Sequence, residues 1–218
     1  MNLKKYLLIF SLFIFANTYA QFNINTNPFW KAEMEMVDGT IKNGFAQVPN
    51  VSKLKNVIFK TSLNGEKESL KRNLIQKLKV ESPNGKNYLY EKAAIVNTLK
   101  GNSSSGTALM LVEAKNDYVT FYIQSAAYRV NEETDEIVLF YRYQQGSDYP
   151  TIGRYIKKAD AEKANMFYIT NVIGGFKRCA MYHLTEDPAL LEKIENNTLG
   201  KNEIPQIIAE YIATTNTK

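Results

Sequence analysis

Hydrophobic and polar residues alternate along most of residues 29–170. In the first stretch, Trp30 and Met34 alternate with charged residues up to the dipeptide Asp38-Gly39, and residues 40–48 return with a similar alternation. Successive side chains of a strand point to opposite faces, so a period of two is typical of a half-buried β-strand. Asp-Gly supplies the positive φ that a tight turn needs. The pattern therefore predicts a β-hairpin at the start of this region.

The same pattern recurs further along the chain. Asn64-Gly65 and Asn84-Gly85 each separate two alternating stretches, and three such turns so close together predict an antiparallel meander. Later stretches bring the predicted strands to about ten, and the connection at residues 159–163 is either a hairpin turn or a helical turn. Because open sheets of that size curl, we predict an antiparallel β-sandwich or a half-open barrel.

Near Val172 the hydrophobic period changes to that of a helix. Phe176 and Cys179 begin a first amphipathic helix, and Glu186-Asp187-Pro188 opens a second one with proline in its first turn. Residues 203–212 form a third helix, whose apolar face consists of Ile204, Ile207, Ile208, Tyr211 and Ile212. Short amphipathic helices must bury these faces, so we expect all three to pack on one face or end of the sheet.

The N-terminal segment has the pattern of a secretory signal peptide. Lys4 and Lys5 precede an apolar run at residues 6–15, and Thr18-Tyr19-Ala20 offers small residues before the expected cleavage site. An uncleaved membrane anchor is the weaker alternative, because the apolar run is about ten residues long and a span needs roughly 20. We expect an exported protein, periplasmic or secreted, that does not span a membrane after cleavage.

These observations predict a β-rich α+β protein in three parts. Residues 1–20 form the signal peptide, residues 21–170 an antiparallel β domain, and residues 171–218 the C-terminal helices packed on that domain.

Composition excludes several functional classes. The chain has 27 basic and 22 acidic residues, a net charge of +5. Without Lys4 and Lys5 the counts are 25 and 22, which leaves +3 and gives no case for a nucleic-acid partner. One histidine and one cysteine argue against most metal sites and most nucleophile–histidine chemistry, so we expect no cofactor and no metal.

The single histidine and the single cysteine both fall in the first predicted helix. We expect Cys179 to be a buried small hydrophobe, with a reactive thiol as the alternative. For His183 we expect packing or a charge contact at the helix C-terminus. Carboxylate pairs such as Glu33 and Glu35 are expected on a solvated strand face, and no catalytic residue is predicted.

Aromatic residues suggest the one candidate binding surface. The chain has 14 tyrosines and 11 phenylalanines, several of them on predicted neighbouring strands. One interpretation is sheet core with cross-strand aromatic pairs. The alternative is an aromatic platform, with planar arginine donors, for an envelope protein, a glycan or an apolar small molecule. The candidate ligand-binding residues are Tyr122, Arg129, Tyr141, Arg142 and Tyr143.

Two stretches resemble a group of proteins. The first is Met-x-Met-Val-Asp-Gly-Thr-Ile-Lys-x-Gly-Phe from Met34, with Pro49 and Val-Ile-Phe-Lys from Val57 after it. The second is Phe-Lys-Arg from Phe176, followed by the acidic Pro-x-Leu sequence from Glu186. Together they resemble uncharacterised small secreted proteins of Bacteroidota, in which a Cys-Pro step is usual where Glu186-Asp187 stands here. The resemblance implies export and a similar architecture, and it implies no activity.

The sequence thus favours an exported, non-enzymatic binding or interaction module of the envelope or the extracellular space. One alternative is a carboxylate-dependent hydrolase of envelope or extracellular polymer, which needs a buried acid in a cleft. The other is a lipocalin-like carrier of an apolar ligand, which needs an apolar cavity.

Overall fold

A computed structural model describes residues 28–49, 55–97, 99, 106–125, 127–131, 133–140, 152–169 and 175–216. The predicted signal peptide lies outside the described residues.

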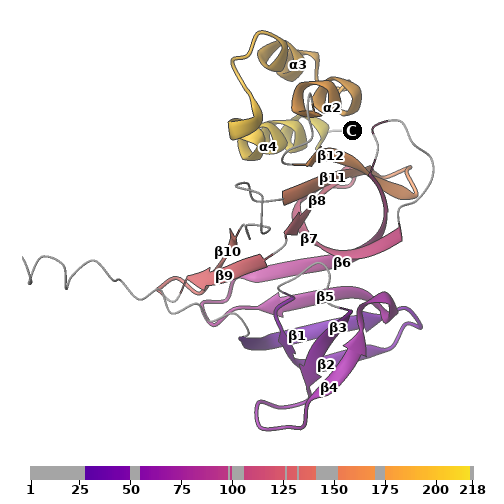
Figure 1. Ribbon diagram of the computed structural model, residues 1–218, viewed down its shortest axis with the longest axis vertical. Coiled ribbons are helices and arrows are strands. Elements are labelled where there is room, and N and C mark those ends of the chain that lie inside the picture. The colour runs from indigo at the N-terminus through magenta and orange to yellow at the C-terminus, as the bar shows by residue number, and fades with distance from the viewer. Residues whose placement is uncertain are drawn as a thin grey trace, which may run out of the picture.

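Within these ranges, strands come first and helices last (Figure 1). The strands are β1 (Phe29–Met36), β2 (Ile41–Gln47), β3 (Asn56–Lys60), β4 (Glu68–Lys71), β5 (Ile75–Glu81), β6 (Asn87–Val96), β7 (Gly106–Lys115), β8 (Val119–Ser125), β9 (Ala127–Asn131), β10 (Glu136–Phe140), β11 (Ile152–Lys158) and β12 (Lys163–Ile169). The helices are η1 (Arg72–Leu74), α2 (Gly175–His183), α3 (Pro188–Glu195), η2 (Lys201–Glu203) and α4 (Ile204–Thr215).

Ten of the strands form one continuous sheet in the order β12-β11-β8-β7-β6-β5-β1-β2-β3-β4. The sheet closes on itself because β12 also pairs with β6, in parallel, where Lys163 faces Ala94 and Asn165 faces Val96. Strands β6, β7, β8, β11 and β12 thus form a closed five-stranded barrel, and β5, β1, β2, β3 and β4 extend the sheet beyond it (Figure 1).

The structure confirms the β-rich fold followed by three C-terminal helices and favours a barrel over a sandwich. The barrel is closed where the sequence predicted a half-open one, and its closing pair is parallel in a sheet expected to be antiparallel. The sequence offers no sign of this pairing because β6 and β12 are far apart along the chain. Two hairpin turns are confirmed, with Gly39 at φ 84° and Gly85 at φ 83°. Residues 159–162 form a tight turn between β11 and β12, without a helix.

The barrel strands divide their side chains between two cores. On β8, Tyr122 points into the barrel interior with Met110, Tyr155 and Met166, while Phe121 points outward to the helices. Phe121 meets Phe167 edge-on, with ring centroids 5.4 Å apart, and meets Tyr211 of α4 in the same way at 6.0 Å. The helices therefore cover one outer wall of the barrel, as Figure 1 shows above β11 and β12.

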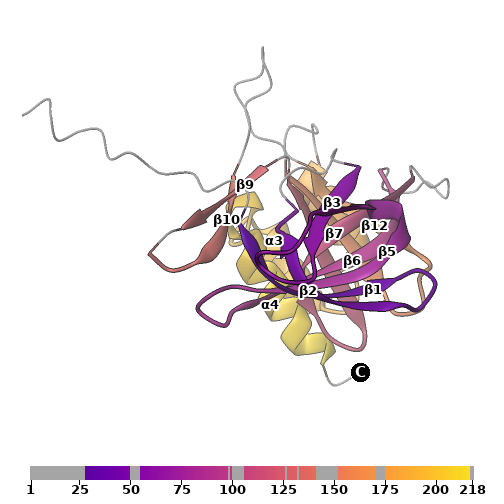
Figure 2. The same cartoon turned by 90° about the horizontal axis from the view of Figure 1, so that it is seen from below.

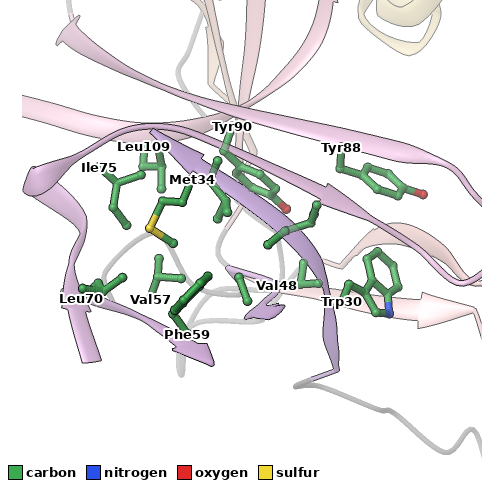
Figure 3. Close-up of a cluster of buried hydrophobic side chains, with 14 of the residues drawn as sticks. Trp30, Met34, Val48, Val57, Phe59, Leu70, Ile75, Tyr88, Tyr90 and Leu109 are labelled. Carbon is green, nitrogen blue, oxygen red and sulfur yellow. The ribbon is translucent and has the colours of Figure 1, made fainter. Parts of the chain in front are cut away.

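A third core fills the concave side of the extended sheet. Trp30, Met34 and Phe59 lie in it, and Leu109 reaches it from the barrel strand β7 (Figure 3). Tyr88 and Tyr90 come from the first half of β6, and the second half of the same strand faces the barrel interior. Strand β6 is thus the wall that the two cores share.

The remaining strands, β9 and β10, form a ribbon beside the barrel (Figure 2). The backbone N–H of Ile137 donates to the Tyr88 hydroxyl at 2.9 Å, and Lys86 pairs with Glu136 at 2.7 Å. The Asn84 side chain also donates to the carbonyl of Thr134. These contacts hold the ribbon against the hairpin between β5 and β6.

Helix α3 begins as its sequence predicts, with Pro188 in the first turn and Asp187 as N-cap. The Asp187 carboxylate accepts from the backbone N–H of Leu190 at 3.0 Å and is buried.

We expect Asp187→Ala to lower the free energy of unfolding by about 1–2 kcal/mol, because the N–H of Leu190 loses its acceptor. Urea unfolding followed by circular dichroism would measure this. Glu192→Ala on the exposed face of the same helix is the control, and an equal loss in both variants would contradict the capping role.

Candidate functional site

Three groups of polar side chains deserve comparison as candidate sites. The first joins the helices to the barrel around Glu186, in the turn between α2 and α3. Its carboxylate accepts from the Tyr211 hydroxyl at 2.6 Å, the Tyr118 hydroxyl at 3.1 Å and the Lys158 ammonium at 2.5 Å. Tyr211 belongs to α4, Lys158 ends β11, and Tyr118 precedes β8. One carboxylate therefore connects a helix to two corners of the barrel.

Glu186 is suited to hold this junction and poorly suited to acid catalysis. Burial alone would raise the pKa of its carboxyl, but the bonds from Lys158 and Tyr211 outweigh burial and lower the pKa to about 2. A general acid needs the opposite shift. Burial and the bond to Glu186 both raise the pKa of Tyr211, so its hydroxyl stays protonated and donates.

His183 lies beside this junction and is neutral. It is buried, and its Nε2 lies 3.1 Å from the carbonyl oxygen of Met166, which requires a proton on Nε2 to donate. Burial lowers the pKa of the imidazole to about 4. Of the two roles expected for His183, its burial confirms packing, and the same burial disfavours the imidazolium that a charge contact at the helix C-terminus would need. Cys179 is also confirmed as a buried side chain, 2% exposed, and burial raises the pKa of its thiol.

The second polar group lies inside the barrel. Glu91 accepts from the Tyr122 hydroxyl at 3.1 Å and from the Lys115 ammonium at 2.8 Å. Tyr122 is 3% exposed, and burial followed by the charge of Glu91 raises its pKa. Both carboxylate oxygens are therefore engaged, and the Tyr122 ring is part of the barrel core.

The third candidate is a groove of about 520 Å³ between the η1 turn and the end of the barrel. A volume of this size lies within the range of small-molecule pockets. Its basic residues are Lys55, Lys71, Arg72 and Lys92, and no acidic residue lines it among the residues that the structure describes. We call this feature the basic groove.

Backbone contacts fix the corner that carries the cations. The N–H of Arg72 donates to the carbonyl of Lys55 at 2.8 Å, and Asn56 pairs with Lys71 across β3 and β4. The Lys92 ammonium donates to the carbonyl of Asn73 at 2.8 Å and thereby joins η1 to β6. Burial raises the pKa of Tyr90, and the positive charge of nearby Arg72 acts in the opposite direction. The backbone of Lys55, Lys71 and Arg72 is thus fixed where β3, β4 and η1 meet, and Lys92 joins this corner from β6.

Several lysines elsewhere on the surface form ion pairs with glutamates. Lys31, Lys42 and Lys77 pair with Glu81, Glu68 and Glu35 at 2.9–3.3 Å. A smaller hollow of about 170 Å³ near Gly44 is lined by two lysines and two glutamates, so its charges balance. Among the described ion pairs, none involves Lys55, Lys71 or Lys92. The described lining of the basic groove therefore carries a net positive charge, and such concave surfaces concentrate anions.

Of the five predicted ligand-binding residues, the structure describes the side chain of Tyr122 alone. Tyr122 lies in the barrel core, and Arg129 contributes backbone to β9 while its side chain lies outside the described residues. Tyr141, Arg142 and Tyr143 also lie outside them. The five-residue set stays a prediction. Sequence reasoning missed the four groove cations, because lysines and glutamates interleave along the chain and only folding shows which lysines lack an acid neighbour.

Comparisons with known proteins find no relative of this chain. No protein-family model matches the chain, and no curated protein and no solved structure matches it either. The resemblance to secreted Bacteroidota proteins therefore stays a prediction. Within the described ranges no helix is long and apolar enough to cross a membrane. The same ranges contain no group of three or more His, Cys, Asp or Glu side chains placed to hold a metal ion.

The Glu186 junction predicts a loss of stability in acid. Its carboxyl has a folded pKa of about 2 against the ordinary 4.5, so its contribution is present above pH 4.5 and is lost as the pH falls toward 2. His183, with a folded pKa of about 4 against 6.5, adds a loss between pH 6.5 and 4 because the unfolded chain binds its proton more readily.

We therefore expect Glu186→Gln to lower the free energy of unfolding by about 2 kcal/mol at pH 7, and by progressively less as the pH approaches 2. Urea unfolding at a series of pH values measures this difference. Glu195→Gln, an exposed acid on α3, is the control. A cost for Glu186→Gln that is the same at every pH would contradict the ionised junction.

Proposed function

We propose that this protein is an exported, non-enzymatic binding module of the envelope or the extracellular space, and that its ligand is an anion bound in the basic groove. The observation that carries the proposal is the described lining of the 520 Å³ groove, which includes Lys55, Lys71 and Lys92 and no acidic residue. None of these three lysines takes part in a described ion pair. The proposal of export rests on the pattern of residues 1–20.

The position of the groove supports a binding role. It lies where the end of β6, the start of β7 and the end of β8 form the mouth of the barrel, which is a common location for small-molecule sites. The Tyr155 hydroxyl donates to Asn97 at 2.9 Å, and the side-chain oxygen of Gln124 at this mouth lies 3.4 Å from the same hydroxyl. The groove is built on strands and a short turn that are joined by backbone hydrogen bonds, and such a rigid scaffold loses little entropy when a ligand binds.

The alternatives from the sequence find less support. A carboxylate-dependent hydrolase needs an acid that is free to exchange a proton, whereas Glu91, Glu113 and Glu186 each accept from a lysine or an arginine. A lipocalin-like carrier holds its ligand inside a wider barrel, whereas Tyr122, Tyr155 and other side chains fill this five-stranded one. A protein or glycan partner would fit the groove through an acidic group.

The test uses a fluorescent organic anion, 8-anilinonaphthalene-1-sulfonate, titrated into the purified protein. We expect one site, weakened roughly two- to fivefold by Lys71→Gln and roughly tenfold by Lys55→Gln with Lys71→Gln, because each substitution removes one partly exposed cation. Binding should also weaken as sodium chloride is raised.

Lys201→Gln makes the same change of charge on η2, in the C-terminal helical region, and is the matched control. Unfolding curves of all variants show that the fold is retained. Equal affinity in the groove variants and the control would contradict anion binding at this site.

A further inference from the structure

Strand β4 is the last strand in the order of the extended sheet. Its inner edge pairs with β3, and no described strand pairs with its outer edge, which lies at the opposite end of the molecule from the helices (Figure 1). Ser69 and Lys71 are exposed, whereas Leu70 between them is buried in the core of the extended sheet. An exposed edge of this kind presents backbone groups that a further strand can pair with.

The register with β3 fixes which backbone groups of β4 point outward. The N–H of Arg72 donates to the carbonyl of Lys55 at 2.8 Å, so this pair of residues is a hydrogen-bonded one. Hydrogen-bonded and non-hydrogen-bonded pairs alternate along an antiparallel ladder, so Lys71 and Ser69 both occupy non-hydrogen-bonded positions. The N–H of Lys71, and the N–H and the C=O of Ser69, therefore point away from the sheet.

Lys71 joins this outer edge to the basic groove. Its backbone lies on the edge, and its side chain lines the groove with Lys55 and Lys92. None of these three lysines takes part in a described ion pair. A strand added to the edge would place one of its side chains beside Lys71, on the face that lines the groove. The positive charge there favours an acidic side chain.

We infer that the anion bound by this protein is an acidic side chain of an extended peptide, which adds a strand antiparallel to β4. This inference rests on the proposed function. The peptide residue opposite Ser69 exchanges two hydrogen bonds with it. The residue two positions earlier in the peptide accepts from the N–H of Lys71 and holds its carboxylate beside the Lys71 ammonium. A second copy of the chain is a poorer partner, because edge-to-edge pairing would bring two basic corners together.

The first experiment varies the peptide. The ¹⁵N-labelled protein would be titrated with acetyl-Glu-Thr-Val-Thr-Val-amide, and we expect saturating shifts at the backbone amides of Ser69 and Lys71. Replacing the glutamate of the peptide by glutamine should weaken binding roughly threefold to fivefold, because one partly exposed ion pair is lost. Methylating the backbone nitrogen of the third peptide residue should weaken binding at least fivefold, because this nitrogen donates to the carbonyl of Ser69.

The variant Ser69→Pro tests the edge from the side of the protein. Proline removes the N–H that points outward and breaks no hydrogen bond to β3, which is why edge strands tolerate it. We expect Ser69→Pro to weaken the peptide at least roughly tenfold and to change the affinity for 8-anilinonaphthalene-1-sulfonate less than twofold. Ser69→Ala is the matched control, because it also loses the hydroxyl that accepts from Asn56 but keeps the backbone N–H. It should change both affinities less than twofold.

The outcomes distinguish this inference from the proposed function. Absent shifts at Ser69 and Lys71, or undiminished binding of the methylated peptide to the unmodified protein, would overturn strand addition while leaving anion binding in place. Equal affinity for the glutamate and glutamine peptides would overturn the acidic partner. If Lys71→Gln weakened neither the glutamate peptide nor 8-anilinonaphthalene-1-sulfonate, both the inference and the proposed function would be wrong.

Discussion

Strand β6 belongs to both the barrel and the extended sheet, and the rest of the structure depends on this shared strand. Its first half pairs with β5 and carries Tyr88 and Tyr90 into the core of the extended sheet. Its last residues pair in parallel with β12 and close the barrel, whose interior contains Ala93 and Ile95 from the same strand. A strand shared in this way fixes the angle between the barrel and the sheet, because neither can turn without breaking its hydrogen bonds. The η1 turn, held to β6 by Lys92, therefore stands over the barrel mouth.

The polar side chains at the helix-covered wall and those at the η1 corner serve two different purposes. At the helix-covered wall, Glu186 is engaged by a lysine and two tyrosines, and His183 is neutral, so the charges are compensated. At the η1 corner, cations gather without a described acid among the residues that line the groove. Burying or concentrating like charges costs free energy unless a partner is present. The Glu186 junction is therefore expected to hold the fold together, whereas the proposed binding role rests on the lysines of the basic groove.

The sequence predicts local features well and non-local ones poorly. Asp38-Gly39 and Asn84-Gly85 specify their hairpins through local backbone preference, and Asp187-Pro188 specifies the start of α3. The parallel pair of β6 with β12 leaves no local trace, since it depends on how the whole sheet curls. The aromatic count led toward Tyr122, which is a core residue, because aromatic side chains favour strands whether or not they bind a ligand. Lys55 and Lys92 line the same groove only because folding brings their two parts of the chain together.

Mapping a bound ligand on the protein tests the central claim most directly. A ¹⁵N-labelled sample titrated with 8-anilinonaphthalene-1-sulfonate would report, for each assigned backbone amide, whether its surroundings change. The account predicts shifts that saturate together at Arg72, Asn73 and Thr107, around the basic groove. Shifts confined to exposed apolar side chains elsewhere, such as Val37 or Tyr182, would contradict it. So would the absence of any saturating shift.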